Sequence, residues 1–252
     1  ALLLDTAAPY AEVQPLMVGV LCHLVARRLG FDAATRQRLL AAVLSCNLGM
    51  WQAQAALAQP GPLSPALAAV VREHPVRSHA LLRERGVTDP LWLELVLQHH
   101  ERPDGSGYPQ GLPGPAINPL ARLLSLADIY CAMVLPREYR TGIRAQQAVR
   151  RIFLARGQHV DAALAADFIG EIGVFPPGAF VRLVNGETGI VVRRGTPRRE
   201  SPQVSCIRSP RGSEYVRPLW RDCALDPRFA IADVLGRETL SHALPALWTA
   251  AH

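Results

Sequence analysis

The sequence predicts a mainly α-helical domain followed by a small C-terminal β module, so that the protein is α+β overall. From Tyr10 to Ile172, apolar residues recur at helical spacing between signals that start and end helices. After Phe175-Pro176-Pro177-Gly178 the pattern changes to alternating apolar and polar residues separated by hairpin turns. We therefore expect a helical domain over residues 1–173 and a β module with a C-terminal helical segment over residues 174–252.

The composition is that of a packed globular protein. Of the 252 residues, 49% are hydrophobic and 19% are charged, and no apolar run reaches the roughly 18 residues that a membrane-spanning helix requires. Five cysteines show no CxxC pairing, which indicates reduced thiols in a cytoplasmic protein. The net charge is +6 and all 27 basic residues are arginine, so no lysine can act in any site. Because no basic run is interleaved with aromatic residues, the sequence does not favour nucleic-acid binding.

The first predicted helices follow one another closely. One covers Tyr10–Leu29, and the next covers about Ala33–Leu48 with Asp32 as its N-terminal cap. A short third element is expected over Gln52–Ala58, before Pro60-Gly61-Pro62 breaks the chain. The apolar stripe of the first helix consists of Val13, Leu16, Met17, Val20, Leu21, Leu24 and Val25.

Proline signals place the helices that come next. Ser64-Pro65 starts a helix that we expect to end at His74, because Pro75 starts another one. Asp89-Pro90 gives the same signal for the helix that carries the His99-His100 pair. The elements expected after it are an irregular stretch over Glu101–Asn118, with four prolines and four glycines, and helices over Pro119–Val134, Arg144–Ala155 and Asp161–Ile172.

The β module is predicted from its turns and its alternating pattern. Asn185-Gly186 is a strong hairpin signal, and Arg211-Gly212 marks a second turn. A last amphipathic segment begins at Ile231 and is expected to pack back on the module. The expected strands are Phe180–Val184, Gly189–Val192, Pro202–Ile207 and Glu214–Leu219.

The stretch that carries most of the chemistry begins with two adjacent histidines and an acid, His99-His100-Glu101. Imidazoles beside a glycine-rich backbone that can approach a ligand closely indicate a metal or phosphate site. From His99 to Pro109 the sequence fits the pattern HHE-x-x-DGSGYP, and on this pattern the chain resembles the HD-GYP family. The resemblance extends from about Tyr10 to Ile172, and the β module is similar to one attached to some proteobacterial members.

The resemblance implies an HD-type multi-helix domain that holds two or three metal ions, usually iron or manganese, and hydrolyses cyclic di-GMP. Paired metal ions stabilise both the attacking and the leaving oxygen of a phosphodiester, and a carboxylate is needed to bridge them. The implied metal ligands are His74, His99, His100 and Asp128, and the implied phosphate-binding residues are Arg137 and Arg140. The implied recognition loop, which in the family is thought to contact diguanylate cyclases, contains Asp104, Gly105, Gly107, Tyr108 and Pro109.

The doublet for which the family is named is absent from this chain. Where the family has His-Asp-x-Gly-Lys, the sequence is Cys46-Asn47-Leu48-Gly49-Met50. Cysteine thus replaces a histidine ligand, an amide replaces the bridging carboxylate, and methionine replaces a lysine that would contact phosphate. On the first helix, Gln14 and Met17 occupy the positions where another histidine is expected. We therefore expect a broken dinuclear site, with no catalytic residue at these positions and no more than a partial set of metal ligands.

Several of these residues also have a purely structural interpretation. Cys46 is expected as a small buried apolar residue rather than a nucleophile, because no activating base is apparent near it. His99 and His100, beside Asp128, could hydrogen-bond within the core instead of binding a metal. The loop could serve only to hold the shape of the backbone.

Three functions stay open. The first is a catalytically degenerate HD-GYP protein that binds cyclic di-GMP, or a signalling protein such as a diguanylate cyclase, through its loop. The second is a weak phosphodiesterase that uses one metal ion held by His74, His99, His100 and Asp128. The third is a scaffold without nucleotide that uses the arginine-rich β module for protein contacts. We favour the first, because an intact loop beside a damaged metal centre fits a recognition surface better than an active site.

Overall fold

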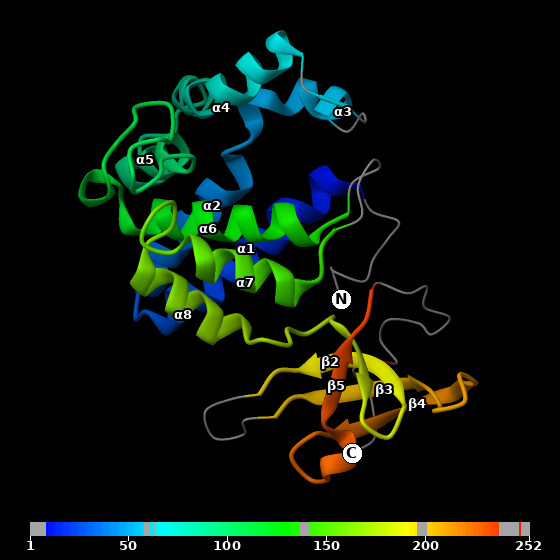
Figure 1. Cartoon of the computed structure of the whole chain (residues 1–252). Helices are drawn as coiled ribbons and strands as arrows, with labels where there is room; N and C mark the ends of the chain where they lie inside the picture. Colours follow the sequence, from blue (N-terminus) through cyan, green and yellow to red (C-terminus); the bar gives the residue numbers. More distant parts are fainter. Residues whose placement is uncertain are drawn as a thin grey trace. The chain divides into compact units, whose positions relative to one another are not determined.

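The computed structural model describes residues 9–57, 61–62, 64–136, 142–195, 201–236 and 247. The chain forms two compact units (Figure 1). The helical unit comprises residues 7–143 and 150–171, and the β unit is built mainly on the residues from Ile172 onward. Within the described ranges, no helix is both long and apolar enough to cross a membrane.

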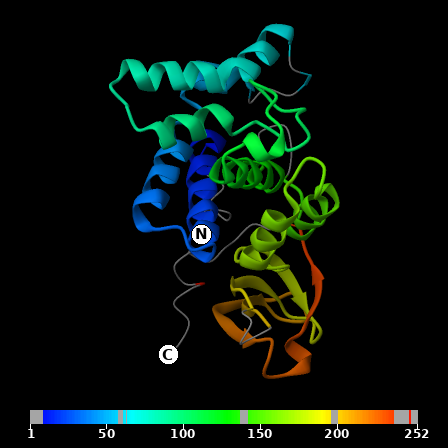
Figure 2. The ribbon, with the colours of Figure 1, turned by 90° about the vertical axis from the view of Figure 1, so that its left-hand side faces the viewer.

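The helical unit confirms the mainly α-helical prediction. Helix α1 packs against α2 and α6, and α5 contacts α2, α4 and α6 (Figure 2). Helix starts follow the predicted signals, since the side chain of Asp32 accepts a hydrogen bond from the Thr35 N–H and that of Ser64 accepts one from Leu67. The helices are α1 (Tyr10–Arg28), α2 (Ala33–Ser45), α3 (Gln54–Leu57), α4 (Pro65–Glu84), α5 (Pro90–Gln98), α6 (Pro119–Val134), α7 (Ala145–Ala155) and α8 (Ala162–Ile172), with short 3-10 turns η1 (Leu48–Ala53) and η2 (Gly114–Ala116).

The predicted break at Pro75 is wrong, because α4 continues through this residue to Glu84. A proline inside a helix has no N–H for the carbonyl four residues earlier, which here is that of Val71. The Nδ1 atom of His74 lies 2.6 Å from the Val71 oxygen and takes the place of the missing donor. The helix therefore keeps its course without an unsatisfied carbonyl.

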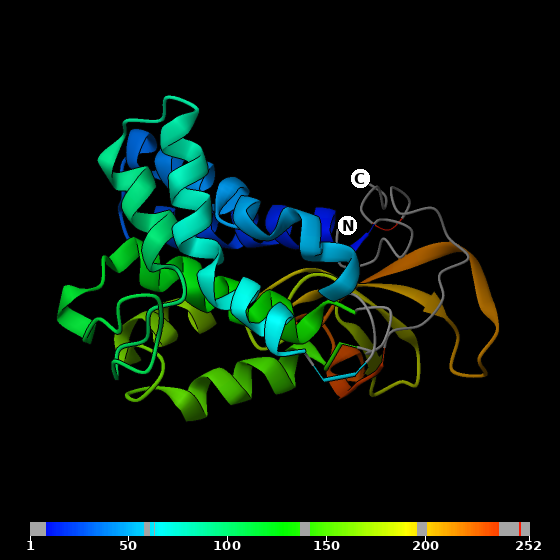
Figure 3. The same ribbon diagram turned by 90° about the horizontal axis from the view of Figure 1, so that it is seen from above.

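The end of the second helix was also placed too late. Helix α2 ends at Ser45, and the chain then turns into η1, which lies along α4 (Figure 3). The Ser78 hydroxyl joins the two elements, since it donates to the Cys46 carbonyl at 2.6 Å and accepts from the Gly49 N–H at 2.8 Å. Any side chain at Gly49 would collide with the backbone of α4, so this glycine permits the close approach. Of the predicted third element, Gln54–Leu57 is helical and Ala58 lies outside the described residues.

The β unit contains an antiparallel five-stranded sheet in the described part of the chain, with the strand order β4-β3-β2-β1-β5. The Asn185-Gly186 hairpin is confirmed, and Gly186 has a φ of 87°, which favours glycine. The segment from Ile231 to Val234, expected as part of a helical segment, is a strand that pairs with β1. Of the residues expected to continue that helix, the structure describes only Leu247 beyond Gly236, and Leu247 is buried. The strands are β1 (Phe180–Leu183), β2 (Thr188–Arg193), β3 (Gln203–Arg208), β4 (Glu214–Asp222) and β5 (Ile231–Val234).

Both faces of this sheet carry apolar clusters, and among the described residues of the unit Glu187 is a buried charge. Glu187, which is 3% exposed, accepts two hydrogen bonds of 2.7 Å from Arg221, one of 2.7 Å from the Tyr215 hydroxyl and one of 2.8 Å from Asn185. The Arg221 hydrogen bonds, with those from Asn185 and Tyr215, lower the pKa of Glu187 to about 2. The carboxylate therefore stays ionised and links the first hairpin to β4.

We expect Glu187→Gln to lower the free energy of unfolding by about 2–3 kcal/mol at pH 7, because the native state no longer holds a stabilised carboxylate. A carboxyl group whose pKa is lowered by folding stabilises the native state at pH values above 4.5, its pKa in the unfolded chain. This stabilisation is lost as the pH falls towards 2, the pKa in the folded protein. The difference between wild type and variant should therefore shrink over that interval. Chemical denaturation of the full chain at several pH values measures this difference.

Glu214→Gln, which removes the exposed Arg208–Glu214 pair at 3.3 Å, is the control and should cost less than about 1 kcal/mol. Equal losses from the two variants would contradict this role of Glu187.

Candidate functional site

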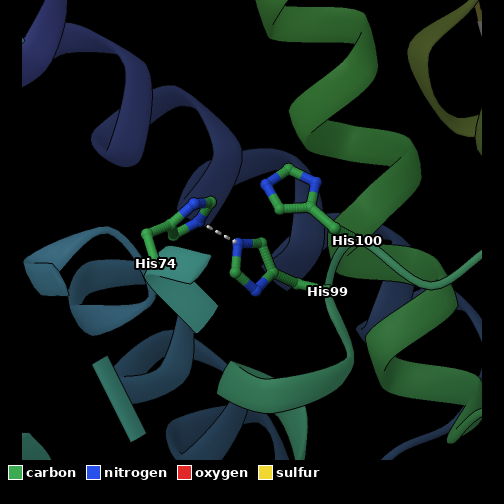
Figure 4. A group of neighbouring side chains, drawn as sticks. All are labelled: His74, His99 and His100. Carbon is green, nitrogen blue, oxygen red and sulfur yellow. Dashed lines mark hydrogen bonds between the residues drawn. The ribbon is translucent and has the colours of Figure 1, made fainter. Parts of the chain in front are cut away.

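Three histidines from different points of the helical unit converge in the core. His74 lies in the middle of α4, His99 caps the end of α5, and His100 follows in the next turn. Their rings point toward one another (Figure 4), and one nitrogen from each lies within 4.8 Å of the others. His74 is fully buried and His99 is 1% exposed, while His100 is half-buried. We call these three residues the histidine cluster. The prediction placed His99 and His100 on the helix itself, whereas both lie just beyond its last residue.

Hydrogen bonds to the backbone determine which nitrogen of each buried ring carries a proton. The Nδ1 of His74 bonds to the Val71 carbonyl at 2.6 Å, and the Nδ1 of His99 bonds to the Val96 carbonyl at 2.7 Å. A carbonyl oxygen can only accept, so both Nδ1 atoms must donate. In the neutral rings, both Nε2 atoms are therefore left with a lone pair, and they face each other at 3.0 Å.

The rings are neutral at physiological pH because burial disfavours the imidazolium form. Burial lowers the pKa of His74 to about 4 and, with the neighbouring His74, lowers that of His99 to about 3. It also brings the pKa of His100 well below its ordinary value. Two lone pairs at 3.0 Å repel unless a proton or a cation lies between them. A borderline divalent cation fits this donor set, since neutral imidazole suits zinc and iron.

Asp128 lies outside the group of three histidine nitrogens that come within 4.8 Å of one another. It lies on α6, and its Oδ1 accepts a hydrogen bond from the side-chain amide of Gln14 on α1. Its negative charge contributes to the raised pKa of Cys46, after the larger effect of burial, so the carboxylate lies near that thiol. The sequence pointed to Gln14 as a lost histidine position, but it did not reveal that this residue binds Asp128.

The three substituted positions show no activated catalytic group. Cys46 is buried, its thiol lies 3.4 Å from the Val43 carbonyl, and burial raises its pKa, so the thiolate is disfavoured. Asn47 is half-buried, and its backbone carbonyl accepts a hydrogen bond of 3.1 Å from the backbone N–H of Met50. Met50 lines a surface groove together with Trp51. These surroundings agree with the interpretation of Cys46 as a small buried apolar residue.

The loop after the histidines is held by Glu101, a residue whose role the sequence did not reveal beyond its place in the motif. Glu101 is 1% exposed, and its carboxylate accepts the N–H groups of Gln110 at 2.6 Å and Leu112 at 2.9 Å. Gly105 has a φ of 76°, and a side chain at Gly107 would collide with the backbone of Glu101 and Arg102. The two glycines are thus required by the shape of the loop.

The other predicted loop residues have separate surroundings. Asp104 accepts hydrogen bonds from Ser106 and lies 2.9 Å from Nδ1 of His159, so it faces the outside of the loop. Tyr108 stacks on His100, with ring centroids 4.8 Å apart and ring planes at 28°, and a cis peptide bond joins it to Pro109. The loop is therefore in direct contact with the histidine cluster. Arg137 and Arg140 lie outside the described residues.

We expect Glu101→Ala to lower the free energy of unfolding by about 2–4 kcal/mol, because it leaves two loop N–H groups without their acceptor. The amides of Gln110 and Leu112 should lose protection in hydrogen exchange, which reports on the loop directly. Asp104→Asn, at an exposed position in the same loop, should cost less than about 1 kcal/mol. Unchanged exchange at both amides in the Ala variant would show that Glu101 does not hold the loop.

Comparisons with known proteins match the helical part of the chain most clearly. A family model described as HD domain matches residues 5–164. The cyclic di-GMP phosphodiesterase PA4108 of Pseudomonas aeruginosa is 32% identical over 209 residues, which cover 82% of this chain and 50% of that protein. The 3'3'-cGAMP-specific phosphodiesterase 3 of Vibrio cholerae is 30% identical over 148 residues, covering 58% of this chain and 32% of that protein. The chain thus spans half or less of these relatives.

A solved structure supports the fold. Bd1817, an HDG"Y"P protein from Bdellovibrio bacteriovorus, superimposes with a TM-score of 0.53 over 63% of this chain and 51% of that one. The sequence identity is 21%, so this similarity concerns the arrangement of the elements alone.

Proposed function

The chain belongs to the HD domain family, and from this premise we propose that it binds cyclic di-GMP in bacterial signalling while hydrolysing it poorly or not at all. The observation that carries the proposal is the contrast between two halves of one site. The histidine cluster and the loop that contacts it have the residues that the HD-GYP resemblance implies, whereas Asn47 and the buried Cys46 thiol stand where that resemblance implies a bridging carboxylate and a ligand. This contrast supports a chain that binds the nucleotide without hydrolysing it efficiently.

The ligand class follows from the relatives together with the charge of the chain. Two relatives are named phosphodiesterases for cyclic di-GMP and for 3'3'-cGAMP, which share a cyclic dinucleotide backbone. This chain has a net charge of +6, and arginine forks suit phosphate oxygens. We assign phosphate contacts to Arg137 and Arg140, as the HD-GYP resemblance implies. When the nucleotide is bound, the loop surface around Asp104 and Tyr108 would contact a cytoplasmic signalling protein such as a diguanylate cyclase.

His74, His99 and His100 would hold one divalent cation, because the Nε2 lone pairs of His74 and His99 face each other and one ring nitrogen of His100 lies within 4.8 Å of both ligand atoms. A bound cation supplies Lewis acidity to a phosphate oxygen. The chain's own residues hold the rings in place, through the Val71 and Val96 carbonyls. Among the described residues, the group of ligand atoms within 4.8 Å of one another contains only the three histidines, and Asn47 stands where the HD-GYP resemblance implies the bridging carboxylate, so a second cation would lack that bridge.

A weak one-metal phosphodiesterase is the second candidate. It is favoured by the three-imidazole cluster, because a cation with three protein ligands keeps a position for water or substrate. In this case the loss of the paired-metal arrangement would slow hydrolysis without abolishing it.

Metal analysis of the purified chain, followed by calorimetry and a hydrolysis assay with cyclic di-GMP, separates these functions. We expect up to one metal ion per chain, measurable nucleotide binding and little or no product. Stoichiometric metal with sustained turnover would replace our proposal by the phosphodiesterase. Absence of nucleotide binding, with and without added metal, would instead favour a scaffold.

We expect the double variant Cys46→His, Asn47→Asp to raise metal occupancy by about one ion per chain, because it restores an imidazole and a bridging carboxylate. Elemental analysis after incubation with iron, manganese or zinc measures the gain. Cys46→His alone is the matched control, since it adds a ligand without a bridge and should raise occupancy less. If the double variant binds no more metal than wild type, the idea of a retained but incomplete metal site is wrong.

A further inference from the structure

Two arginines flank the loop tyrosine that contacts the histidine cluster. Arg72 lies on α4, two residues before His74, and its guanidinium carbon lies over the Tyr108 ring, 5.8 Å from its centroid. Arg102 lies in the loop, two residues after His100. Both side chains belong to exposed residues. The surface beside the histidine cluster therefore carries two positive charges.

The backbone of Arg102 lies against Gly107, the neighbour of Tyr108, and the charges of both arginines act on groups at this surface. The positive charge of Arg102 helps to lower the pKa of His100, after burial and the neighbouring histidines. Burial and the charge of Asp128 raise the pKa of Tyr108 to about 12, and both arginines oppose this rise. The phenol of Tyr108 is therefore a neutral donor at physiological pH.

Neither guanidinium is neutralised by the chain itself. In the described part of the molecule, no carboxylate forms an ion pair with Arg72 or Arg102, whereas the neighbouring Arg77 pairs with Glu73 at 2.6 Å. Asp128, whose charge helps to raise the pKa of Tyr108, accepts a hydrogen bond from Gln14. Two exposed, uncompensated guanidinium groups beside neutral imidazoles favour an anionic ligand.

We propose that Arg72 and Arg102 form a clamp for a phosphodiester at the histidine cluster, with Tyr108 as its supporting platform. The proposal rests on the proposed function, for which it names the residues that recognise the ligand. A planar guanidinium donates two parallel hydrogen bonds to phosphate oxygens, which a lysine cannot do. The clamp supplies positive charge that Met50, at the lost lysine position, cannot provide.

Tyr108 supports the clamp through its ring rather than its hydroxyl. The ring stacks on His100 and lies beneath the Arg72 guanidinium, so it restricts where that side chain can go. Tyr108→Phe keeps this ring and should change ligand binding by less than about threefold. Tyr108→Ala removes it and should weaken binding by about tenfold.

The clamp is tested by calorimetry on the full chain with Arg72→Gln and Arg102→Gln. Each variant should bind cyclic di-GMP at least about tenfold more weakly, as expected for the loss of a charge-assisted hydrogen bond. Arg83→Gln is the matched control, because it removes an equal charge from an exposed residue of α4 and should have less than about a twofold effect. If a glutamine variant fails to fold, Arg72→Lys keeps the charge without the planar fork and should give an intermediate loss.

A second probe, bis(p-nitrophenyl) phosphate, separates the clamp from the proposed function because it is a phosphodiester without base or ribose. The clamp is supported if both glutamine variants bind both ligands more weakly than wild type does. If wild type binds this probe in an arginine-dependent way but does not bind cyclic di-GMP, the clamp stands and the proposed function fails. The clamp is overturned if wild type binds neither ligand, or if both variants bind within twofold of wild type.

Discussion

The site depends on a hydrogen bond that a proline makes necessary. Pro75 has no N–H, so the Val71 carbonyl lacks its helical partner, and the Nδ1 of His74 donates to it at 2.6 Å. This bond keeps α4 continuous, holds the imidazole in one orientation and leaves its Nε2 lone pair directed at His99. At the end of α5, the Nδ1 of His99 also donates to a backbone carbonyl, that of Val96. The two bonds fix the orientation of both rings, so that their Nε2 atoms face each other.

The loop is held independently of the substituted positions. Its shape depends on the buried carboxylate of Glu101, which accepts two backbone N–H groups, and on glycines with no room for a side chain. None of these interactions involves Cys46 or Asn47. The loop can therefore keep its shape whatever residues stand at positions 46 and 47, as our proposal requires.

The hydrogen bond between Gln14 and Asp128 shows how the helical core accommodates a carboxylate. A carboxylate near buried thiols would be costly without a partner. The Gln14 amide supplies a hydrogen bond to it across α1 and α6, where a histidine was expected from the HD-GYP pattern. An amide donates to a carboxylate but brings no positive charge. The core thus keeps the aspartate hydrogen-bonded to a neutral donor.

The sequence by itself determined the α+β class, the helix starts at Asp32 and Ser64, and the Asn185-Gly186 hairpin. These features depend on neighbouring residues, through periodicity, capping and turn geometry. The contiguous motif also allowed the comparison with the HD-GYP pattern, in which Cys46 and Asn47 stand at the position of the His-Asp pair. Only the tertiary structure decided that α4 passes through Pro75, that Gln14 binds Asp128, and that the segment beginning at Ile231 is a strand beside β1. Each of these depends on a partner chosen by packing, and a partner distant in the chain leaves no local signal in the sequence.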